Sequence, residues 1–265
     1  MILFALSANA SIAALFVAGI VPGLLMCAGF MGVCWWVGHR RGFPRDTTPF
    51  AWPAFRRHLL YASPALLLPV LIIVFLRLGI ATPTEVAVLS TLYAGLVSAV
   101  VYRDLGWRRL NDAVVHAGLA TGVVLLVIMA SAAIGWLLTF DRMPDGIVQW
   151  VQSHVHSAWL VIVLMNLLML FIGMFIDLPA AVLLLTPVFV PLAQSIGMDM
   201  TQLGIMMVVN LALGLYTPPV GTTLFITSSL ARVKVGQTVR ELIPFYLVAL
   251  AVLALVSYVP ASILR

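Results

Sequence analysis

Charged residues are scarce in this sequence, and that scarcity excludes most soluble folds. Only 9% of the 265 residues are charged and 63% are hydrophobic, whereas soluble domains carry roughly 25% charged residues. No Asp, Glu, Lys or Arg occurs in three long runs, residues 1–38, 201–231 and 242–264. Each run is long enough for a transmembrane helix, which needs about 20 residues. The runs lack the polar–apolar alternation of membrane barrel strands. The sequence therefore predicts an all-α polytopic membrane protein.

Cysteine and lysine are also rare, and the sequence contains no spacing typical of catalytic or metal-binding residues. Cys27 and Cys34 would lie about 10 Å apart along a helix axis, too far for a disulfide, so we expect core or lipid-facing positions without a metal or redox role. Lys234 is the only lysine, and no HExxH-like spacing exists. His154 and His156 do not share a helix face. We therefore expect no enzyme activity and no metal cofactor.

The basic residues are grouped between the apolar runs, which suits a topology signal better than nucleic-acid binding. The groups lie at residues 40–57, 103–109 and 232–240. The first, with five arginines, is the strongest cytoplasmic signal, and the second lies on the same side if residues 62–76 and 86–102 each cross once. Phe50, Trp52 and Phe55 near the first group suggest a short interfacial helix. An ordinary basic loop is the alternative.

Apolar runs and helix signals divide the chain into expected elements. Spans are expected at residues 11–38, 62–76, 86–102, 111–140, 159–175 and 242–264. Thr82 or Thr84 can cap a helix with Glu85 in its first turn. We expect a scaffold and arm part at residues 1–112 and a transport part at residues 113–265.

A shorter segment between two of these spans has an amphipathic pattern. Residues 143–153 form this segment, with Ile147, Trp150 and Val151 expected on one face. A polar turn with the two histidines is expected to follow it.

Residues 173–223 are strongly apolar, yet Gly and Pro interrupt them repeatedly. Residues 180–196 make a poor simple span, because they are few and contain two prolines. We therefore expect a helical hairpin at about residues 173–197, turning at the sequence Leu185–Pro187. Asp199 is expected to cap the next helix.

A broken helix is expected at about residues 201–231. The helix from Thr201 stops at Gly214, because two prolines and two glycines follow, and it restarts after Gly221. Pro218 and Pro219 have no amide donor, so nearby carbonyls need other partners. Carbonyl and threonine oxygens suit Na⁺, and the free N–H groups of the restarting helix favour an anion. A proline-kinked span in a structural bundle is the alternative.

These patterns define a candidate substrate and ion site. It comprises Gly173, Asp177, Thr186, Pro187, Asn210, Gly214, Thr217, Pro218, Pro219, Gly221, Thr222 and Thr223. The Na⁺ candidates are Thr217, Gly221 and Thr222. Asp177 at membrane depth would be functional, but it could equally cap a helix at the interface. Asn210 could bind an ion or hydrogen-bond between helices.

The order of these motifs resembles the large membrane subunit of tripartite ATP-independent periplasmic (TRAP) transporters. The matching segments are Gly173–Asp177, Leu185–Pro187, Met206–Asn210 and Gly214–Gly221. Further matches are Ala18–Gly23 leading to Arg40–Pro44, Thr82–Glu85 followed by Tyr93, and Pro244–Phe245. The resemblance covers essentially the whole chain.

The resemblance implies Na⁺-coupled import of an organic acid, often a C4-dicarboxylate or a sialic acid, across the bacterial inner membrane. It implies a periplasmic solute-binding protein, a small membrane subunit and the lipid bilayer as partners, with Na⁺ as coupling ion. It also implies an elevator fold of two inverted repeats, each with a re-entrant hairpin and a discontinuous helix. The elements found here match the second repeat, so a missing N-terminal half would supply the rest of the site.

Two other functions remain open at this stage. One is an ion-coupled organic-anion carrier of the same superfamily that works without a binding protein. The other is a structural membrane subunit that does not transport. The chain is expected to be either a fragment of a large subunit or one half of a split one, with little transport activity alone.

Overall fold

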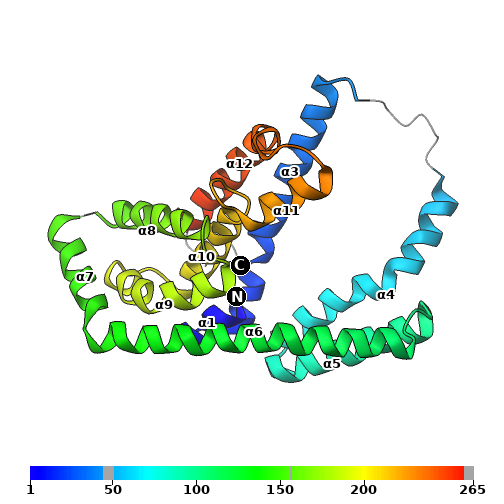
Figure 1. Cartoon of the computed structure of the whole chain (residues 1–265), viewed down its shortest axis with the longest axis horizontal. Coiled ribbons are helices and arrows are strands. Elements are labelled where there is room, and N and C mark those ends of the chain that lie inside the picture. Colours follow the sequence, from blue (N-terminus) through cyan, green and yellow to red (C-terminus); the bar gives the residue numbers. More distant parts are fainter. Residues whose placement is uncertain (44–50, 156, 260–265) are drawn as a thin grey trace. The chain divides into compact units, whose positions relative to one another are not determined.

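The computed structural model describes residues 1–43, 51–155 and 157–259, and within these residues it contains helices and no strand. The N-terminal helices are α1 (Ile2–Ala8), α2 (Ile12–Ala18), α3 (Ile20–Arg40), α4 (Trp52–Arg77), α5 (Pro83–Leu96) and the π-helical turn η1 (Val97–Val101). The later helices are α6 (Trp107–Phe140), α7 (Met143–His154), α8 (Ala158–Gly173), α9 (Leu178–Ser195), α10 (Met200–Gly214), α11 (Thr222–Ala231) and α12 (Val235–Tyr258). Figure 1 shows them in chain order.

Six stretches of the described chain are long and apolar enough to cross a membrane. They are α2 with α3, α4, α5 with η1, α6, α9 and α12. Large apolar side chains of α4 and α6 are exposed along the length of both helices, as expected for helices that face lipid. The all-α polytopic membrane fold predicted from the sequence is confirmed.

Residues 39–123 form one of two compact units. In this unit α4 packs against α5, and the Tyr93 hydroxyl donates to the Pro64 carbonyl over 2.8 Å. Pro64 and Pro69 have no amide hydrogen to donate to the carbonyls of Leu60 and Ala65, and the Ser63 hydroxyl donates to the Leu60 carbonyl over 2.8 Å instead. The helix nevertheless continues without interruption to Arg77.

The short interfacial helix expected near the first basic group is not a separate element. Trp52 and Phe55 belong to the first turns of α4, which runs from there through the whole following span. Their rings stack 5.5 Å apart. Pro44, Arg45 and Phe50 of the same prediction lie outside the described residues.

The start of α5 shows which threonine caps it. Thr82 accepts a hydrogen bond from the Glu85 amide, and the Glu85 carboxylate accepts one from the Thr82 amide over 2.6 Å. This reciprocal pair is a capping box. The cap expected at Thr82 or Thr84 is therefore at Thr82.

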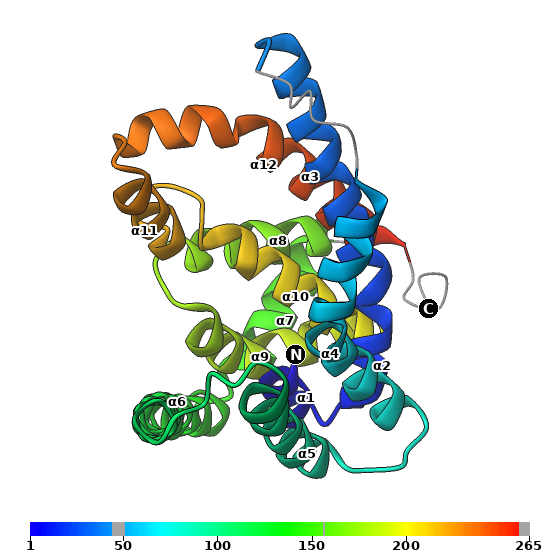
Figure 2. The same cartoon turned by 90° about the vertical axis from the view of Figure 1, so that its right-hand side faces the viewer.

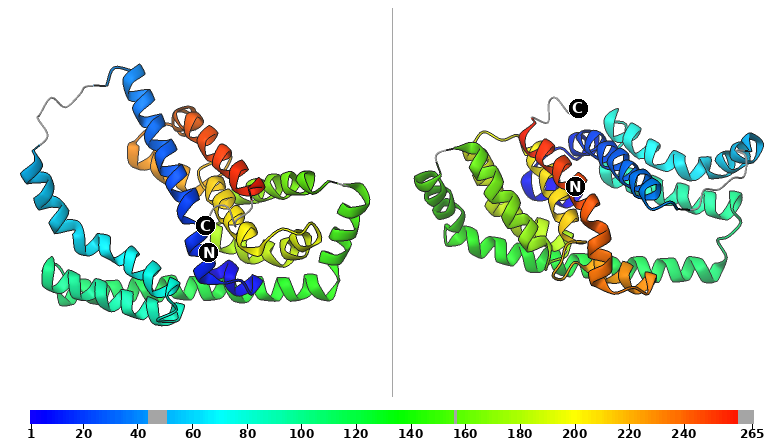
Figure 3. Two further views of the ribbon diagram at one scale, coloured as in Figure 1. Left: turned by 180° about the vertical axis from the view of Figure 1, so that it is seen from behind. Right: turned by 90° about the horizontal axis from the view of Figure 1, so that it is seen from above.

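Residues 1–38 and 124–265 form the second compact unit. Here α10 packs against α8, α9, α12 and α2, and α9 packs against α1 and α7, as Figures 2 and 3 show. Its fully buried side chains include Phe4, Phe189, Met165 and Met206. The two units divide the chain differently from the two parts expected at residues 1–112 and 113–265, because residues 1–38 pack with the later helices.

The helical hairpin predicted at about residues 173–197 is wrong, and α9, which occupies most of these residues, is long and apolar enough to cross a membrane, contrary to the poor span expected there. α9 is one continuous helix that contains Pro187 and Pro191, so the chain does not turn at residues 185–187. The turn lies earlier, at residues 174–177, between α8 and α9. The end of α9 returns to α7, which precedes α8. We call α8, the turn and α9 together the α8–α9 hairpin, and α8 covers most of the span expected at residues 159–175.

Two further predictions need correction. Trp150 does not share the buried face of α7, because 57% of it is exposed while Val151 is buried; its ring stacks on His154 instead. Arg240 lies inside α12 rather than in a loop, since that helix begins at Val235.

Candidate functional site

The turn after α8 and the break after α10 meet at two glycines. A Cβ added to Gly214 would lie 2.5 Å from the carbonyl carbon of Gly173, and one added to Gly173 would lie 3.4 Å from the Cα of Gly214. Small residues of this kind let helix backbones approach closely in membrane proteins. The contact therefore joins the end of α8 to the end of α10.

A hydrogen bond extends this contact into the two loops. The Gly221 amide donates to the Met174 carbonyl over 3.0 Å, so the tip of the α8–α9 hairpin is bound to the last residue of the break. Gly221 has φ +39°, and a Cβ there would lie 2.7 Å from the Thr217 carbonyl oxygen. Only glycine fits this position without strain.

The break between α10 and α11 also closes on itself. The Thr223 amide donates to the Leu215 carbonyl over 3.0 Å, and the Thr217 amide donates to the Gly214 carbonyl. The Thr217 hydroxyl donates to the Leu213 carbonyl over 2.7 Å. The predicted broken helix, with its stop at Gly214 and its restart after Gly221, is confirmed.

α12 supports the break from one side. The Tyr246 hydroxyl donates to the Tyr216 carbonyl, and the two rings stack with centroids 5.7 Å apart. The following Pro218–Pro219 peptide bond is cis. This aromatic contact comes from a helix that carried no site residue in the sequence prediction.

Several polar groups of the break remain available for a ligand. The carbonyl oxygens of residues 217–220 accept no hydrogen bond from the described part of the chain. The amides of Thr222 and Leu224 likewise donate to no described residue, and the side chains of Thr222 and Thr223 are exposed. Oxygens without a partner fit a small hard cation, and the amides at the start of α11 fit an anion.

Thr186 and Pro187 lie away from this cluster. Both are in the middle of α9 and line a cavity of about 260 Å³ that Thr139 of α6 and Pro144 of α7 also line. The Thr186 hydroxyl is buried and donates to the Val182 carbonyl over 2.6 Å in its own helix. These two residues were expected at a hairpin tip, and α9 places them on a helix face instead.

Asp177 occupies the N-cap position of α9. Its side chain is exposed and makes no capping hydrogen bond. Its backbone carbonyl accepts from the Ala181 amide over 2.9 Å. Asp177 thus lies in the tip that meets the break, with a free carboxylate, whereas Asp199 caps α10 as predicted through bonds from the amides of Thr201 and Gln202.

Asn210 forms an interhelical hydrogen bond, one of its two expected roles. Its side-chain amide donates to the carbonyl and the side-chain oxygen of Asn166 on α8, over 2.9 and 2.7 Å. Asn166 in turn donates to Ser257 of α12 over 2.9 Å. The Asn210 Oδ1 atom is buried without a partner among the described residues.

Sequence reasoning missed Asn166 and Met174. Asn166 is a single polar residue in an otherwise apolar helix, and polar residues inside a membrane helix bundle often hydrogen-bond across helices. That signal could have identified it. Met174 contributes only its carbonyl, for which the sequence carries no signal.

Comparison with known proteins gives a family match over nearly the whole chain. The family model described as "Tripartite ATP-independent periplasmic transporter, DctM component" matches residues 1–262. The "Uncharacterized protein y4mL" of Sinorhizobium fredii is 55% identical over 98% of this chain and 62% of its own length.

Two relatives carry the name of a transporter subunit. The "2,3-diketo-L-gulonate TRAP transporter large permease protein YiaN" of Escherichia coli is 34% identical over 99% of this chain and 62% of its own length. The "C4-dicarboxylate TRAP transporter large permease protein DctM" of Pseudomonas aeruginosa is 34% identical over 98% of this chain and 61% of its own length. The chain thus spans about three fifths of the length of these relatives.

Proposed function

This chain belongs to the family of large permease subunits of TRAP transporters, the DctM component, and from that membership we propose that it forms the second-repeat part of a Na⁺-coupled importer of an organic acid. The substrate we propose is of the C4-dicarboxylate or sialic-acid type. The names of the Escherichia coli and Pseudomonas aeruginosa relatives support this class, since 2,3-diketo-L-gulonate and a C4-dicarboxylate each carry a carboxylate. The proposed location is the bacterial inner membrane.

One observation carries the proposal: the hairpin tip is bound to the break between α10 and α11. The Gly173–Gly214 contact and the bond from the Gly221 amide to the Met174 carbonyl join the turn after α8 to the break after α10. We call these two segments, residues 173–177 and 214–223, the junction. Discontinuous helices at membrane depth form substrate and ion sites in secondary transporters. A purely structural span would not need this junction.

The residues at the junction would act in two ways. The carbonyl oxygens of residues 217–220 and the Thr217 hydroxyl would ligate Na⁺, which supplies the coupling to the ion gradient. The amides at the start of α11 and the hydroxyls of Thr222 and Thr223 would hold the substrate carboxylate. Asp177 in the hairpin tip would face the same region.

The proposed assembly needs further chains. We propose a small membrane subunit, a periplasmic solute-binding protein and a segment that carries the first repeat and completes the site. We also propose that the hairpin and the broken helix move together as in an elevator. The direct bonds between α8 and α10 support a common movement.

An uptake assay tests the proposed function. Proteoliposomes would contain this chain, the small subunit and a first-repeat segment, with binding protein and labelled succinate or N-acetylneuraminate outside. We expect uptake with an inward Na⁺ gradient and at least a tenfold lower rate when choline replaces Na⁺. Equal rates in Na⁺ and choline would contradict Na⁺ coupling.

A pair of glycine variants tests the junction in the same assay. Gly221→Ala should lower uptake more than tenfold, because alanine at φ +39° would meet the Thr217 carbonyl. Gly236→Ala is the control, since a Cβ there meets nothing within 4 Å.

If alanine at Asp177, Thr217 and Thr222 leaves uptake intact, the chain is a structural subunit and the proposal is wrong.

A further inference from the structure

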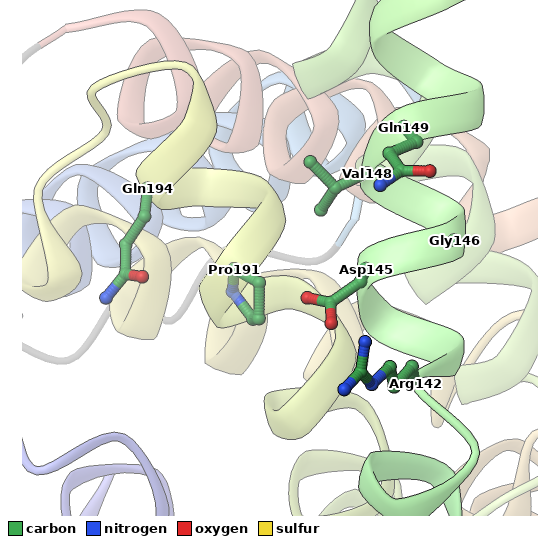
Figure 4. A pocket seen from close by; sticks show the side chains of 7 residues that line it. All are labelled: Arg142, Asp145, Gly146, Val148, Gln149, Pro191 and Gln194. Carbon is green, nitrogen blue, oxygen red and sulfur yellow. The ribbon is translucent and has the colours of Figure 1, made fainter.

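A second polar site lies between α7 and α9, away from the junction. A cavity of about 460 Å³ is lined there by Arg142, Asp145 and Gln149 of the α7 segment and by Pro191 and Gln194 of α9. Figure 4 shows the Asp145 carboxylate pointing toward Pro191 with the Arg142 guanidinium beside it. One cation and one anion thus border the same open space.

The polar side chains of this cavity have no protein partner. Neither the Arg142 guanidinium nor the Asp145 carboxylate forms a hydrogen bond or ion pair with a described residue, although the two lie three positions apart. The side-chain amide groups of Gln149 and Gln194, which also line the cavity, form no hydrogen bond with a described residue. Opposite charges that line a cavity without pairing are complementary to a ligand with both charges.

The position of the cavity along the chain places it at the membrane surface. α6 contains no Asp, Glu, Lys or Arg from Ala113 to its end at Phe140, a length of about 42 Å at 1.5 Å per residue, which exceeds the roughly 30 Å hydrocarbon core. Trp136 and Phe140 stack on each other near that end, and both are exposed. Aromatic residues gather at the headgroup level, and Arg142 follows directly.

A second cavity of about 260 Å³ adjoins the first and shares Arg142, Asp145 and Pro191 with it. Its remaining wall combines three apolar residues with three that carry hydroxyl groups: Pro144, Pro187 and Val190, and Ser7, Thr139 and Thr186. A ligand with a charged head and an apolar continuation would occupy both spaces. A soluble organic acid would leave the apolar part unused.

We propose that this cleft binds the phosphoethanolamine headgroup of a membrane phospholipid. Arg142 binds the phosphate oxygens in a bidentate manner and Asp145 accepts hydrogen bonds from the ammonium group. The glycerol and the first acyl carbons lie against Pro187 and Val190. The cleft shares no residue with the junction, although Thr186 and Pro187 of the site predicted from the sequence line its second cavity.

Native mass spectrometry of the full chain in detergent tests this proposal. The chain would be incubated with phosphatidylethanolamine, phosphatidylglycerol or phosphatidylcholine. We expect preferential retention of phosphatidylethanolamine, because the choline group has no N–H donor and a glycerol headgroup has no cation for Asp145. Asp145→Asn should lower that retention about tenfold, equivalent to ~1.4 kcal/mol, and Arg142→Gln should lower retention of all three lipids.

Arg232→Gln is the matched control. Arg232 is also exposed and also has a positive φ, 55° against 51° for Arg142, but it lies at the end of α11 and does not line the cleft. Equal lipid retention in the Arg142, Asp145 and Arg232 variants would overturn the proposal. Arg142→Lys keeps the charge, so lipid retention in this variant would show that Arg142→Gln acts through the charge and not through a folding defect. Unchanged melting temperatures of the variants in lipid-free detergent would show that all of them fold alike.

A final arm distinguishes the membrane lipid from a soluble ligand. O-phosphoethanolamine carries the same two charges without acyl chains. We expect it to compete with phosphatidylethanolamine only at a concentration at least tenfold higher. Competition at equal concentration would show that the cleft serves a soluble zwitterion and would overturn the lipid assignment.

Discussion

Single residues at the junction act mainly through what they lack. Gly173, Gly214 and Gly221 each have a neighbouring backbone where a side chain would otherwise lie. Pro218 and Pro219 have no amide hydrogen, which leaves carbonyls of the break without helical partners. The candidate site is thus formed largely from backbone atoms, with threonine hydroxyls and Asp177 around it.

Gly214→Ala should destabilise the protein. The new methyl group would overlap the carbonyl carbon of Gly173 at 2.5 Å, and overpacking of this kind costs about 1–3 kcal/mol. We expect a lower melting temperature of the purified protein in detergent. Gly122→Ala in α6 is the control, because a Cβ there meets nothing within 4 Å, and a comparable loss of stability in both variants would contradict the packing argument.

At the scale of elements, hydrogen bonds between helices fix how the hairpin and the broken helix pack. Asn166 connects α8 with Asn210 of α10 and with Ser257 of α12. Gln202 adds bonds from α10 to the carbonyls of Val256 and Ser257. These contacts lie within the buried core, where an unpaired polar group is costly, so they select one arrangement of the three helices.

A double-mutant cycle should detect coupling between Asn166 and Asn210. Either change to leucine removes the bond between the two side chains, while Asn166→Leu keeps the backbone carbonyl to which Asn210 also donates. The double variant should therefore be about 0.6–1.7 kcal/mol more stable than the sum of the single losses predicts. Chemical unfolding in mixed micelles measures this. Thr186→Val combined with Asn210→Leu should be additive, because Thr186 bonds only within α9; coupling of equal size in both pairs would contradict a specific bond.

The capping box gives a prediction for α5. Thr82→Ala removes the acceptor for the Glu85 amide and should weaken the first turn by about 1 kcal/mol. Amide hydrogen exchange of residues 84–87 should become faster by about fivefold, the factor that corresponds to ~1 kcal/mol. Thr84→Ala in the same turn should leave exchange unchanged, since its side chain has no capping role, and equal acceleration in both would show that the cap contributes nothing.

At the scale of the whole molecule, one compact unit carries every residue of the junction. Residues 39–123 form the other unit and supply no part of it. The unit of residues 1–38 and 124–265 also contains the cleft that we propose binds a lipid headgroup. Substrate binding and lipid binding are therefore expected to respond to different variants of the same unit.

Topology is the whole-molecule property that the basic groups predict. In a variant with Cys27 and Cys34 replaced by alanine, Gly106→Cys should react with a membrane-impermeant maleimide only after the cell membrane is permeabilised. Asp141→Cys should react in intact spheroplasts, because α6 separates the two positions and carries the chain across the membrane. Labelling of Gly106→Cys in intact spheroplasts would contradict the predicted orientation.

The sequence by itself determined the membrane class, most helix boundaries and the family. Long uncharged runs require helices, because the bilayer offers no partner for backbone polar groups. Proline and glycine set the end of α10 and the start of α11 locally. The Thr82 cap and the Asp199 cap follow from side chains only two or three residues from their partners. These are short-range effects, so residue order is sufficient to predict them.

Only the tertiary structure decided where the hairpin turns and which residues meet. Pro187 and Pro191 do not end α9, because packing against α1, α7 and α10 holds the helix together despite the lost amide donors. The Asn166–Asn210 bond and the contact of Gly173 with Gly214 join positions about forty residues apart. Such contacts depend on how helices pack, which local sequence does not specify.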